Sequence, residues 1–288
     1  MKKIDFEQVK KNFPKREKTA HKGTFGTLAC VCGSRGFAGA AVMSAEAAIK
    51  SGVGLVNVLL PESIYNVTAS FLKEPIFTLL KETKDGTLSV ECRKELFLAL
   101  EKSTVCLIGC GLGNNEDTRT LVFDIIKNYD RPIVIDADGI NAVSTNINIL
   151  RAAKGPVILT PHPGEMARLL KKDVTFVTEN RESCAKKFAI ENDVIIVLKG
   201  YGTIIADKSG DTFINFTGNP GMASAGMGDV LAGMIASFLA QGMSPLNAAI
   251  SGVYLHGASG DICAEKFSQI SMSATDVINE LPSLFLKF

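Results

Sequence analysis

The strongest constraint on the fold is a repeated alternation of short apolar runs with longer helical stretches. Residues 27–32, 104–108 and 194–198 read TLACVC, TVCLI and VIIVL, and a glycine-containing turn follows each of them. Continuous apolar runs of this length are typical of strands that are buried on both faces of a sheet. The alternation therefore predicts an α/β fold with a mostly parallel sheet and helices on both sides. Because right-handed crossovers bring the loops after such strands to one edge, we expect ligands to bind there.

The remaining elements extend this pattern without a break. Further strands are expected at 54–60, 132–135 and 156–159, and helices at 40–51, 117–128, 230–241 and 245–256. Residues 204–206 and 212–215 flank the tight turn DKSG and predict a hairpin. We find no linker-like stretch and no internal repeat, so the sequence predicts one domain over residues 1–288.

Composition excludes several classes of function. The net charge is +1, so neither nucleic acid nor a membrane surface is an expected partner. The seven cysteines form no C-x-x-C pair and lie mostly in apolar runs, which predicts reduced core thiols and a cytoplasmic location. The basic N-terminal segment has no apolar stretch, so we expect no signal peptide, and no apolar run is long enough to span a bilayer.

The segment Thr217–Asp229, TGNPGMASAGMGD, carries the clearest chemical signal. Its glycines crowd a loop directly before an apolar helix, so backbone N–H groups and the helix N-terminus would form an anion site around Gly226, Met227 and Gly228. Asp229 stands at the start of that helix, either as an N-cap or as a general base that takes a proton from an attacking hydroxyl. This pattern favours phosphate chemistry on a hydroxyl group.

Two more loops follow expected strands. In KGYGT, residues 199–203, glycines would let a nucleotide approach the backbone, with Lys199 and Thr203 as polar contacts; a plain strand-to-hairpin turn is the alternative. In TPHPGE, residues 160–165, two prolines hold His162 at the ligand edge, which favours a functional role. Glu165 would either orient a hydrated Mg²⁺ or start the next helix.

The other glycine-rich turns and histidines carry weaker signals. GSRGFAG and GCGLG, at residues 33–39 and 109–113, are places where backbone could come close to a ligand. Asp136 and Asp138 would bind Mg²⁺ through water or cap the following helix, and we favour capping. His256 lies in an apolar helical pattern, which favours a place in the core.

Taken together, the motifs resemble those of the ADP-dependent NAD(P)H-hydrate dehydratases, the repair branch of the ribokinase-like superfamily. The resemblance spans residues 20–280 and rests on these segments in order: HKGTFGT, GSRGFAGAA, GCGLG, DADGINAV, LTPHPGEMARLL, VLKGYGT, GNPGMASAGMGDVLAG and GVYLHG. It implies a ribokinase-like three-layer α/β/α sandwich. It also implies a stand-alone dehydratase without the epimerase domain to which the family is often fused.

The resemblance implies a defined reaction and a site. The substrate would be the 6-hydroxy hydrate of NADH or NADPH (NADHX or NADPHX), phosphorylated by ADP so that phosphate can leave and the reduced cofactor is restored. Asp229 would be the base and would also contact the hydrate. The resemblance also implies that Ala40, Gly111 and His162 contact the hydrate. The implied nucleotide contacts are Lys199, Gly200, Tyr201, Gly202, Thr203 and Gly228. Glu165 would contact Mg²⁺ weakly, through water. The family also tends to form tetramers, which implies a homotetramer.

Some features depart from the family or leave alternatives open. Family members usually carry Pro at the position of Cys110 and Ala at that of Gly139, both loop substitutions that should be tolerated. Related kinases have an N-x-x-E pattern for Mg²⁺; here His162 and Glu165 have that spacing, which favours the dehydratase branch. The alternatives are an ATP-dependent vitamin-alcohol kinase of thiazole or pyridoxal type, and a non-catalytic nucleotide-sensing protein. NADHX and NADPHX are both candidate substrates, and the resemblance implies ADP, with ATP as the alternative phosphoryl donor.

Overall fold

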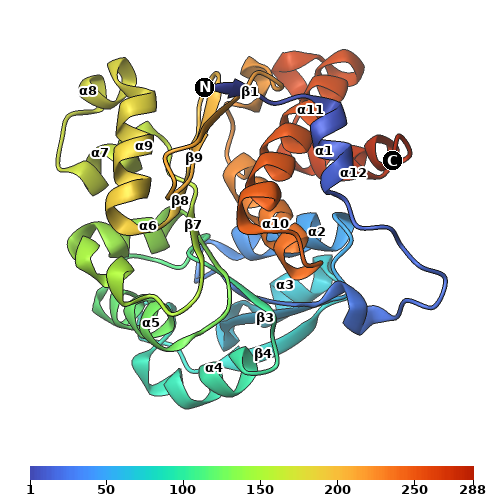
Figure 1. Ribbon diagram of the computed structural model, residues 1–288. Coiled ribbons are helices and arrows are strands. Elements are labelled where there is room, and N and C mark those ends of the chain that lie inside the picture. Colours follow the sequence, from blue (N-terminus) through green and yellow to red (C-terminus); the bar gives the residue numbers. More distant parts are fainter.

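A single ten-stranded sheet lies between two layers of helices in this computed structural model, which describes residues 1–288 (Figure 1). The strand order is β1-β10-β9-β8-β7-β6-β5-β2-β3-β4, and every neighbouring pair is parallel except β8–β9 and β9–β10. The strands are β1 (Lys2–Lys3), β2 (Thr27–Val31), β3 (Leu55–Pro61), β4 (Ile76–Leu80), β5 (Val105–Ile108), β6 (Ile133–Ile135), β7 (Val157–Leu159), β8 (Ile195–Leu198), β9 (Thr203–Ala206) and β10 (Thr212–Asn215). The three-layer α/β/α arrangement with a mostly parallel sheet is therefore confirmed.

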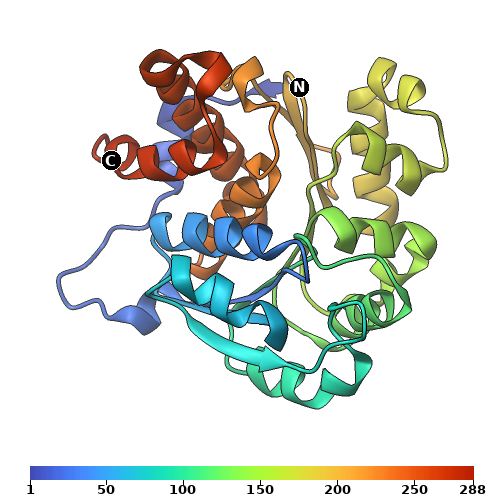
Figure 2. The same ribbon diagram turned by 180° about the vertical axis from the view of Figure 1, so that it is seen from behind.

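Helices cover both faces of the sheet, as Figures 1 and 2 show from opposite sides. One layer consists of α1 (Phe6–Asn12), α2 (Ala38–Lys50), α3 (Tyr65–Phe71), α10 (Met227–Ala240), α11 (Pro245–Ser271) and α12 (Ala274–Phe285). The other consists of α4 (Arg93–Leu100), α5 (Glu116–Asn128), α6 (Ala137–Thr145), α7 (Pro163–Leu170), α8 (Val174–Glu179) and α9 (Arg181–Asn192). Five 3₁₀ turns complete the chain: Lys22–Phe25, Glu62–Ile64, Val90–Cys92, Ile147–Ala152 and Pro220–Met222.

Alternate residues of each central strand enter two different cores. Leu28 and Cys30 of β2 pack under the layer that contains α2 and α10, whereas Ala29 and Val31 pack under the layer that contains α5. Side chains point to opposite faces of a strand, so a strand covered on both sides needs apolar residues at every position. This is the physical reason for the continuous apolar runs.

The predicted strands and helices are present with end shifts of at most three residues, and one helix is much longer than predicted. The prediction ended the second C-terminal helix at His256, but α11 continues through two glycines to Ser271, with a kink at Ser268, whose φ is +70°. These glycines lie inside the helix, and their lack of a side chain lets the loop before α10 approach the helix closely. A Cβ at Gly257 would lie 2.3 Å from Oγ1 of Thr217, and one at Gly260 would lie 2.3 Å from Sδ of Met222.

Two strands have no apolar pattern strong enough for prediction and were missed. β1 contains two exposed lysines and is held by main-chain pairing with β10, which a side-chain pattern does not report. β4 is the opposite edge strand, and only one of its five residues, Leu80, is buried. Both strands lie at the outer edges of the sheet, away from the central strands β5 to β8 whose loops were expected to bind ligands.

Candidate active site

A cleft of about 840 Å³ opens at the carboxyl ends of β6, β7 and β8, against the start of α10. Most of the segment Thr217–Asp229 lines it on one side, and Lys199–Thr203 lines it on the other. Asp136, His162 and Glu165 contribute side chains from the loops after β6 and β7. The structure thus brings together four of the segments that the sequence singled out.

The N-terminus of α10 has no side-chain cap. Its N-cap is Gly226, with φ +89°, and no side chain accepts a hydrogen bond from the first turn. A residue with a Cβ would be strained in this left-handed conformation, and a Cβ here would also lie 2.4 Å from Sδ of Met43. The first N–H groups of a helix have no intrahelical acceptor, so those of Met227 and Gly228 remain available at the cleft. This arrangement suits an anion.

Gly228 keeps the space above the charged groups open. A Cβ at this position would lie 3.3 Å from Nζ of Lys199 and 3.5 Å from Oδ2 of Asp136. A larger side chain would therefore fill the gap between the glycine loop and this ion pair. The absence of a side chain leaves room there for a ligand group that contacts the loop amides and Lys199 at once.

Asp229 lies in the first turn of α10 and does not cap it, so the N-cap alternative is wrong. Burial, and after it the nearby carboxylate of Asp136, raises the pKa of Asp229 to about 7. A general base works best when its pKa lies near the working pH. The carboxylate also lines the cleft beside the free amides of Met227 and Gly228, so the position and the pKa of Asp229 both suit proton abstraction from a bound hydroxyl.

The beginning of the glycine loop is tied to α11 by side chains that the sequence analysis did not single out. Oδ2 of Asp261 accepts a hydrogen bond of 2.9 Å from the N–H of Gly218, and Oδ1 accepts one of 3.1 Å from Nδ2 of Asn219. Oγ1 of Thr217 donates to the carbonyl oxygen of Tyr254 at 2.8 Å. These bonds fix the loop on a rigid helix. An aspartate 32 positions after Asp229 has no local sequence signal that would link it to this loop.

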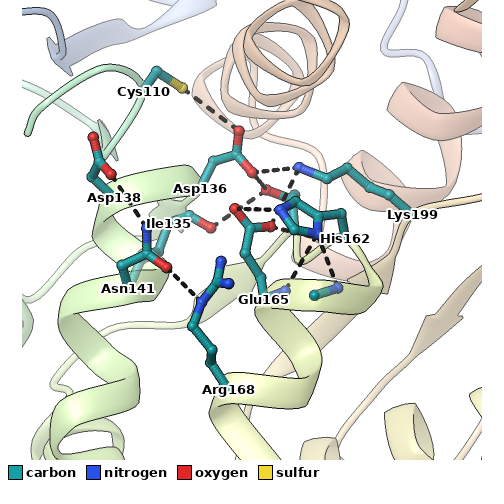
Figure 3. A network of polar contacts seen from close by, with 11 residues as sticks. Cys110, Ile135, Asp136, Asp138, Asn141, His162, Glu165, Arg168 and Lys199 are labelled. Atoms are coloured by element: carbon teal, nitrogen blue, oxygen red, sulfur yellow. Dashed lines mark hydrogen bonds and ion pairs between the residues drawn. The ribbon is translucent and has the colours of Figure 1, made fainter. Parts of the chain in front are cut away.

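Lys199 forms the centre of a buried charge cluster (Figure 3). Its Nζ lies 2.7 Å from Oδ1 of Asp136 and 3.9 Å from Oε2 of Glu165. Burial by itself lowers the pKa of Lys199, but the two carboxylates outweigh it and raise the pKa above its ordinary value. The ammonium group therefore stays charged at the floor of the cleft, where it suits a phosphate group.

The turn after Lys199 is held by an arginine from α9. Nη2 of Arg181 donates to the carbonyl oxygens of Leu198, at 3.1 Å, and Lys199, at 3.4 Å, and Nη1 donates to that of Tyr201. Gly200 adopts φ +137° beside this guanidinium, a conformation that other residues rarely adopt. Arg181 was also missed at the sequence level, because its role depends on the packing of α9 against β8.

His162 and Glu165 form a reciprocal cap at the start of α7. Nδ1 of His162 accepts from the N–H groups of Gly164 and Glu165, and Oε2 of Glu165 accepts from the N–H of His162 at 2.8 Å. Burial and then Lys199 lower the pKa of His162, so the imidazole is neutral at pH 7. Burial raises the pKa of Glu165 to about 7, although Lys199 opposes the shift. The helix-start interpretation of Glu165 is therefore confirmed, and both side chains also line the cleft.

The favoured interpretation of Asp136 and Asp138 as helix caps is wrong. Asp136 occupies the N-cap position of α6, but its side chain makes no capping hydrogen bond. Its Oδ1 instead accepts from Nζ of Lys199 and from Oγ1 of Thr160, both at 2.7 Å. Oδ2 of Asp138 accepts from the N–H of Gly113 at 2.8 Å, and so fixes the loop after β5. Attraction to a buried lysine outweighs local capping, and sequence spacing does not show this lysine.

Two of the implied hydrate contacts lie next to each other but outside the cleft lining. Gly111 adopts φ +60°, and a Cβ there would lie 2.8 Å from Cβ of Ala40. Neither residue is among those that line the cleft, so their contact with a substrate stays a prediction. They lie in the loop after β5 and at the start of α2, at the same edge of the sheet.

His256 is both a core residue and part of the cleft wall. It is buried, as expected, and its Nε2 has no hydrogen-bond partner. Burial and then the charge of Lys199 lower its pKa to about 4, so the imidazole is neutral. The ring also belongs to the lining of the cleft, which its place in an apolar helix did not indicate.

Comparison with known proteins identifies the family. A family model described as NAD(P)H-hydrate dehydratase matches residues 28–283. The chain is 42% identical to a bifunctional NAD(P)H-hydrate repair enzyme of Moorella thermoacetica, over 93% of this chain and 51% of that protein. It is 38% identical to an ADP-dependent (S)-NAD(P)H-hydrate dehydratase of Neisseria meningitidis serogroup B, over 88% of this chain and 82% of that protein. The chain thus spans about half the length of the bifunctional relatives.

Solved structures lead to the same family. An ADP/ATP-dependent NAD(P)H-hydrate dehydratase of Bacillus subtilis, co-crystallised with ATP/Mg²⁺, is 30% identical with a TM-score of 0.84, and the match covers 99% of this chain and 98% of that one. A hydroxyethylthiazole kinase of Pyrococcus horikoshii shares only the fold, at 15% identity, a TM-score of 0.65, and coverage of 96% of this chain and 91% of that one. This chain belongs to the NAD(P)H-hydrate dehydratase family.

Proposed function

We propose that this chain dehydrates the 6-hydroxy hydrate of NADH or NADPH at the expense of ADP, giving the reduced cofactor, AMP and phosphate. The observation that carries the proposal is the position of Asp229. Its carboxylate, with a pKa of about 7, lines the cleft beside the free amides at the start of α10. A base at this position can accept the proton of a hydroxyl group that attacks a bound phosphate.

The first step is phosphoryl transfer to the C6 hydroxyl. Asp229 accepts the hydroxyl proton as the oxygen bonds to the terminal phosphorus of ADP, and the bond from that phosphorus to the bridging oxygen breaks, which releases AMP. Catalysis of such a transfer consists mainly of positioning and charge stabilisation. The N–H groups around Gly226, Met227 and Gly228 would hold the transferring group, with Lys199 on the opposite side of Gly228.

The second step is elimination of phosphate. The electron pair of the C6–O bond leaves with phosphate, helped by the ring nitrogen, and loss of a proton from C5 restores the dihydropyridine ring. Hydroxide is a poor leaving group, and phosphorylation turns it into a good one. The overall change converts the hydrate and ADP into the reduced cofactor, AMP and phosphate, so the atoms balance without any further reactant.

The two substrates are assigned to opposite walls of the cleft. Lys199, Gly200, Tyr201, Gly202 and Thr203 would hold the nucleotide together with Gly228, since their turn is clamped by Arg181 and faces the anion site. The side chain of Tyr201 is exposed at the rim. Ala40, Gly111 and His162 would contact the hydrated dinucleotide. The neutral imidazole of His162 suits a ligand hydrogen bond, not a charge pair.

The residues at the cleft fit a magnesium ion that is bound together with nucleotide phosphates. Three carboxylates, those of Asp136, Glu165 and Asp229, face a single ammonium group, and the pKa values of Glu165 and Asp229 are both raised to about 7. Such an excess of oxygen ligands suits hydrated Mg²⁺. Glu165 and Asp136 would hold the ion through water. When bound, Mg²⁺ would neutralise charge on the phosphate oxygens.

Organisation in the cell and assembly are parts of the same proposal. All ten strands join one sheet, which supports residues 1–288 as a single functional domain. All seven cysteines are buried and free, which supports a reducing, cytoplasmic location. None of the helices combines the length and the apolar composition that a bilayer crossing requires. Exposed apolar side chains of α3 and the edge strand β4, Phe71 and Ile76, support assembly into a homotetramer.

The decisive experiment follows the recovery of reduced-nicotinamide absorbance from purified hydrate. We expect recovery with ADP and Mg²⁺, together with equal amounts of AMP and phosphate. ATP in place of ADP tests nucleotide choice, and NADHX against NADPHX tests substrate choice. Phosphorylation of a thiazole or pyridoxal alcohol by ATP, without any recovery from the hydrate, would overturn the proposal. Nucleotide binding without turnover of either substrate would favour a sensing protein.

A further inference from the structure

A thiol lies directly behind the candidate base, and the proposed reaction gives it no role. Cys110 follows β5 and is fully buried, with Sγ 3.8 Å from Oδ2 of Asp136 (Figure 3). The sulfur atom and one carboxylate oxygen from each of Asp136 and Asp229 all lie within 4.8 Å of one another. Three metal-binding side chains, from the loops after β5 and β6 and from the first turn of α10, therefore converge next to the cleft, which Asp136 and Asp229 line.

The chemistry of this set differs from that of the proposed magnesium site. Mg²⁺ prefers oxygen ligands and keeps several of its waters, so a thiolate adds little to its binding. Zn²⁺ and related thiophilic cations bind both cysteine sulfur and aspartate oxygen. Sites with three protein ligands leave a fourth position for water or a ligand. Cys110, Asp136 and Asp229 supply such a set.

The two oxygens of Asp136 allow a metal to bind without breaking its existing contacts. Oδ1 is occupied by Nζ of Lys199 and by Oγ1 of Thr160, both at 2.7 Å. Oδ2 faces Cys110 and the open space at Gly228, where a Cβ would lie 3.5 Å away. A cation could therefore enter from the cleft, which Asp136 and Asp229 both line, and use Oδ2.

Binding of a cation would also reduce the electrostatic repulsion between the carboxylates of Asp136 and Asp229. The carboxylate of Asp136 is close enough to that of Asp229 to raise its pKa, in addition to the effect of burial. The hydrogen bond with Cys32, burial and the nearby aspartates raise the pKa of the Cys110 thiol well above its ordinary value, so the thiol is neutral in the metal-free chain and must lose its proton to bind a cation. A divalent cation offsets repulsion between the carboxylates and displaces the thiol proton, which is released to solvent.

We propose that Cys110, Asp136 and Asp229 form a binding site for a thiophilic divalent cation of the Zn²⁺ type, and that its occupancy blocks Asp229. A carboxylate that ligates Zn²⁺ no longer accepts a proton. Binding of Zn²⁺ would therefore inhibit phosphoryl transfer, in contrast to the supporting role proposed for Mg²⁺. The inhibition rests on the proposed function, whereas the binding of the metal does not.

The first test measures binding alone, with Cd²⁺ as a probe. The metal-free chain is titrated with Cd²⁺, and thiolate-to-metal charge-transfer absorbance is recorded for the wild type, for Cys110→Ser and for the control Cys184→Ser. Cys184 is another buried thiol, but it lies on α9, outside the cluster. We expect one charge-transfer site per chain in the wild type and in Cys184→Ser, and loss of the band in Cys110→Ser. An unchanged band in Cys110→Ser, or no band in the wild type, overturns the proposal.

The second test measures inhibition by Zn²⁺ at saturating Mg²⁺ and ADP. We expect Cys110→Ser to keep its basal turnover and to need at least about tenfold more Zn²⁺ for half-inhibition, the low end of what disturbing a metal site costs. Equal sensitivity of the wild type and the variant overturns the proposed block of Asp229. If Cys110→Ser folds poorly by circular dichroism, Cys110→Ala takes its place. A chain that binds Cd²⁺ as expected but never restores reduced cofactor refutes the proposed function and leaves the metal site intact.

Discussion

Nζ of Lys199 donates a hydrogen bond of 2.7 Å to Oδ1 of Asp136. The two residues are 63 positions apart in the sequence. The two residues follow β8 and β6, and β7 lies between these strands in the sheet. The contact is nearly buried, with 20% of the Lys199 side chain and 3% of the Asp136 side chain exposed. This ion pair joins the turn at residues 199–203 to the carboxylates of the cleft.

Lys199→Met should destabilise the protein strongly. It leaves Asp136 and Glu165 buried without their cation, and breaking a buried pair in this way costs about 3–5 kcal/mol. The free energy of unfolding, measured by chemical denaturation at pH 7, tests this. Lys208→Met is the matched control, because the pair of Lys208 with Asp193 is exposed and should contribute at most about 1 kcal/mol. Equal losses in the two variants would contradict the central role of the buried pair.

Asp229→Asn should retain nucleotide binding and lose turnover by at least about a hundredfold, the low end for removal of an acid–base group. Asparagine has nearly the same shape but cannot accept the proton of the attacking hydroxyl. Titration with AMP or ADP measures binding, and recovery of reduced-nicotinamide absorbance measures turnover. A variant with near wild-type turnover would refute the role of Asp229 as base.

The pH dependence of kcat/KM should report Asp229. Burial and then Asp136 raise its pKa to about 7, and only the deprotonated carboxylate can accept a proton. The rate should therefore rise about tenfold per pH unit below pH 7 and level off above it. Asp136→Asn removes the neighbouring negative charge and should move this limb to lower pH. A profile that is flat between pH 5 and pH 8 would exclude Asp229 as the titrating base.

Arg181→Ala should weaken nucleotide binding without removing any group that takes part in the chemistry. The guanidinium donates to the carbonyl oxygens of Leu198, Lys199 and Tyr201, and each such bond contributes roughly 1 kcal/mol. We expect the KM for ADP to rise about tenfold or more, with a smaller change in kcat.

Arg119→Ala serves as the control for this variant, because Arg119 pairs only with Glu116 on the surface of α5. Its KM for ADP should equal that of the wild type. A fall in kcat at unchanged KM in Arg181→Ala would show that Arg181 acts on the reaction step and not on the nucleotide turn.

The fold could be predicted to a large extent because strands that are buried on both faces of the sheet need apolar residues at every position. The runs at β2, β5 and β8 are apolar at every position, since Leu28 and Ala29 enter different cores. The edge strands β1 and β4 have no continuous apolar run, because main-chain pairing is enough to hold them. Helix α11 was cut short at its glycines, whose purpose is close packing against Thr217 and Met222.

Local chemistry in the site was also predictable, whereas long-range contacts were not. The glycine loop before Asp229, the KGYGT turn and the His162 loop were found from residue types alone, and the structure places all three around one cleft. The local capping rule failed at Asp136, because a buried lysine 63 positions away attracts its carboxylate more strongly. Arg181 holds the turn after β8 and Asp261 holds the glycine loop. Both residues lie on helices whose packing against these loops cannot be predicted from a local sequence pattern.

The sequence by itself determined the layers of the fold, the edge that carries the loops, the glycine-rich loop before α10 and the candidate base. Each of these follows from short-range rules of burial, backbone conformation and residue chemistry. Only the tertiary structure decided which charges meet: Lys199 with Asp136, Cys110 beside Asp136 and Asp229, and Asp261 under the glycine loop. Electrostatic interactions in a buried site depend on distances between side chains from different strands, and these distances exist only once the chain has folded.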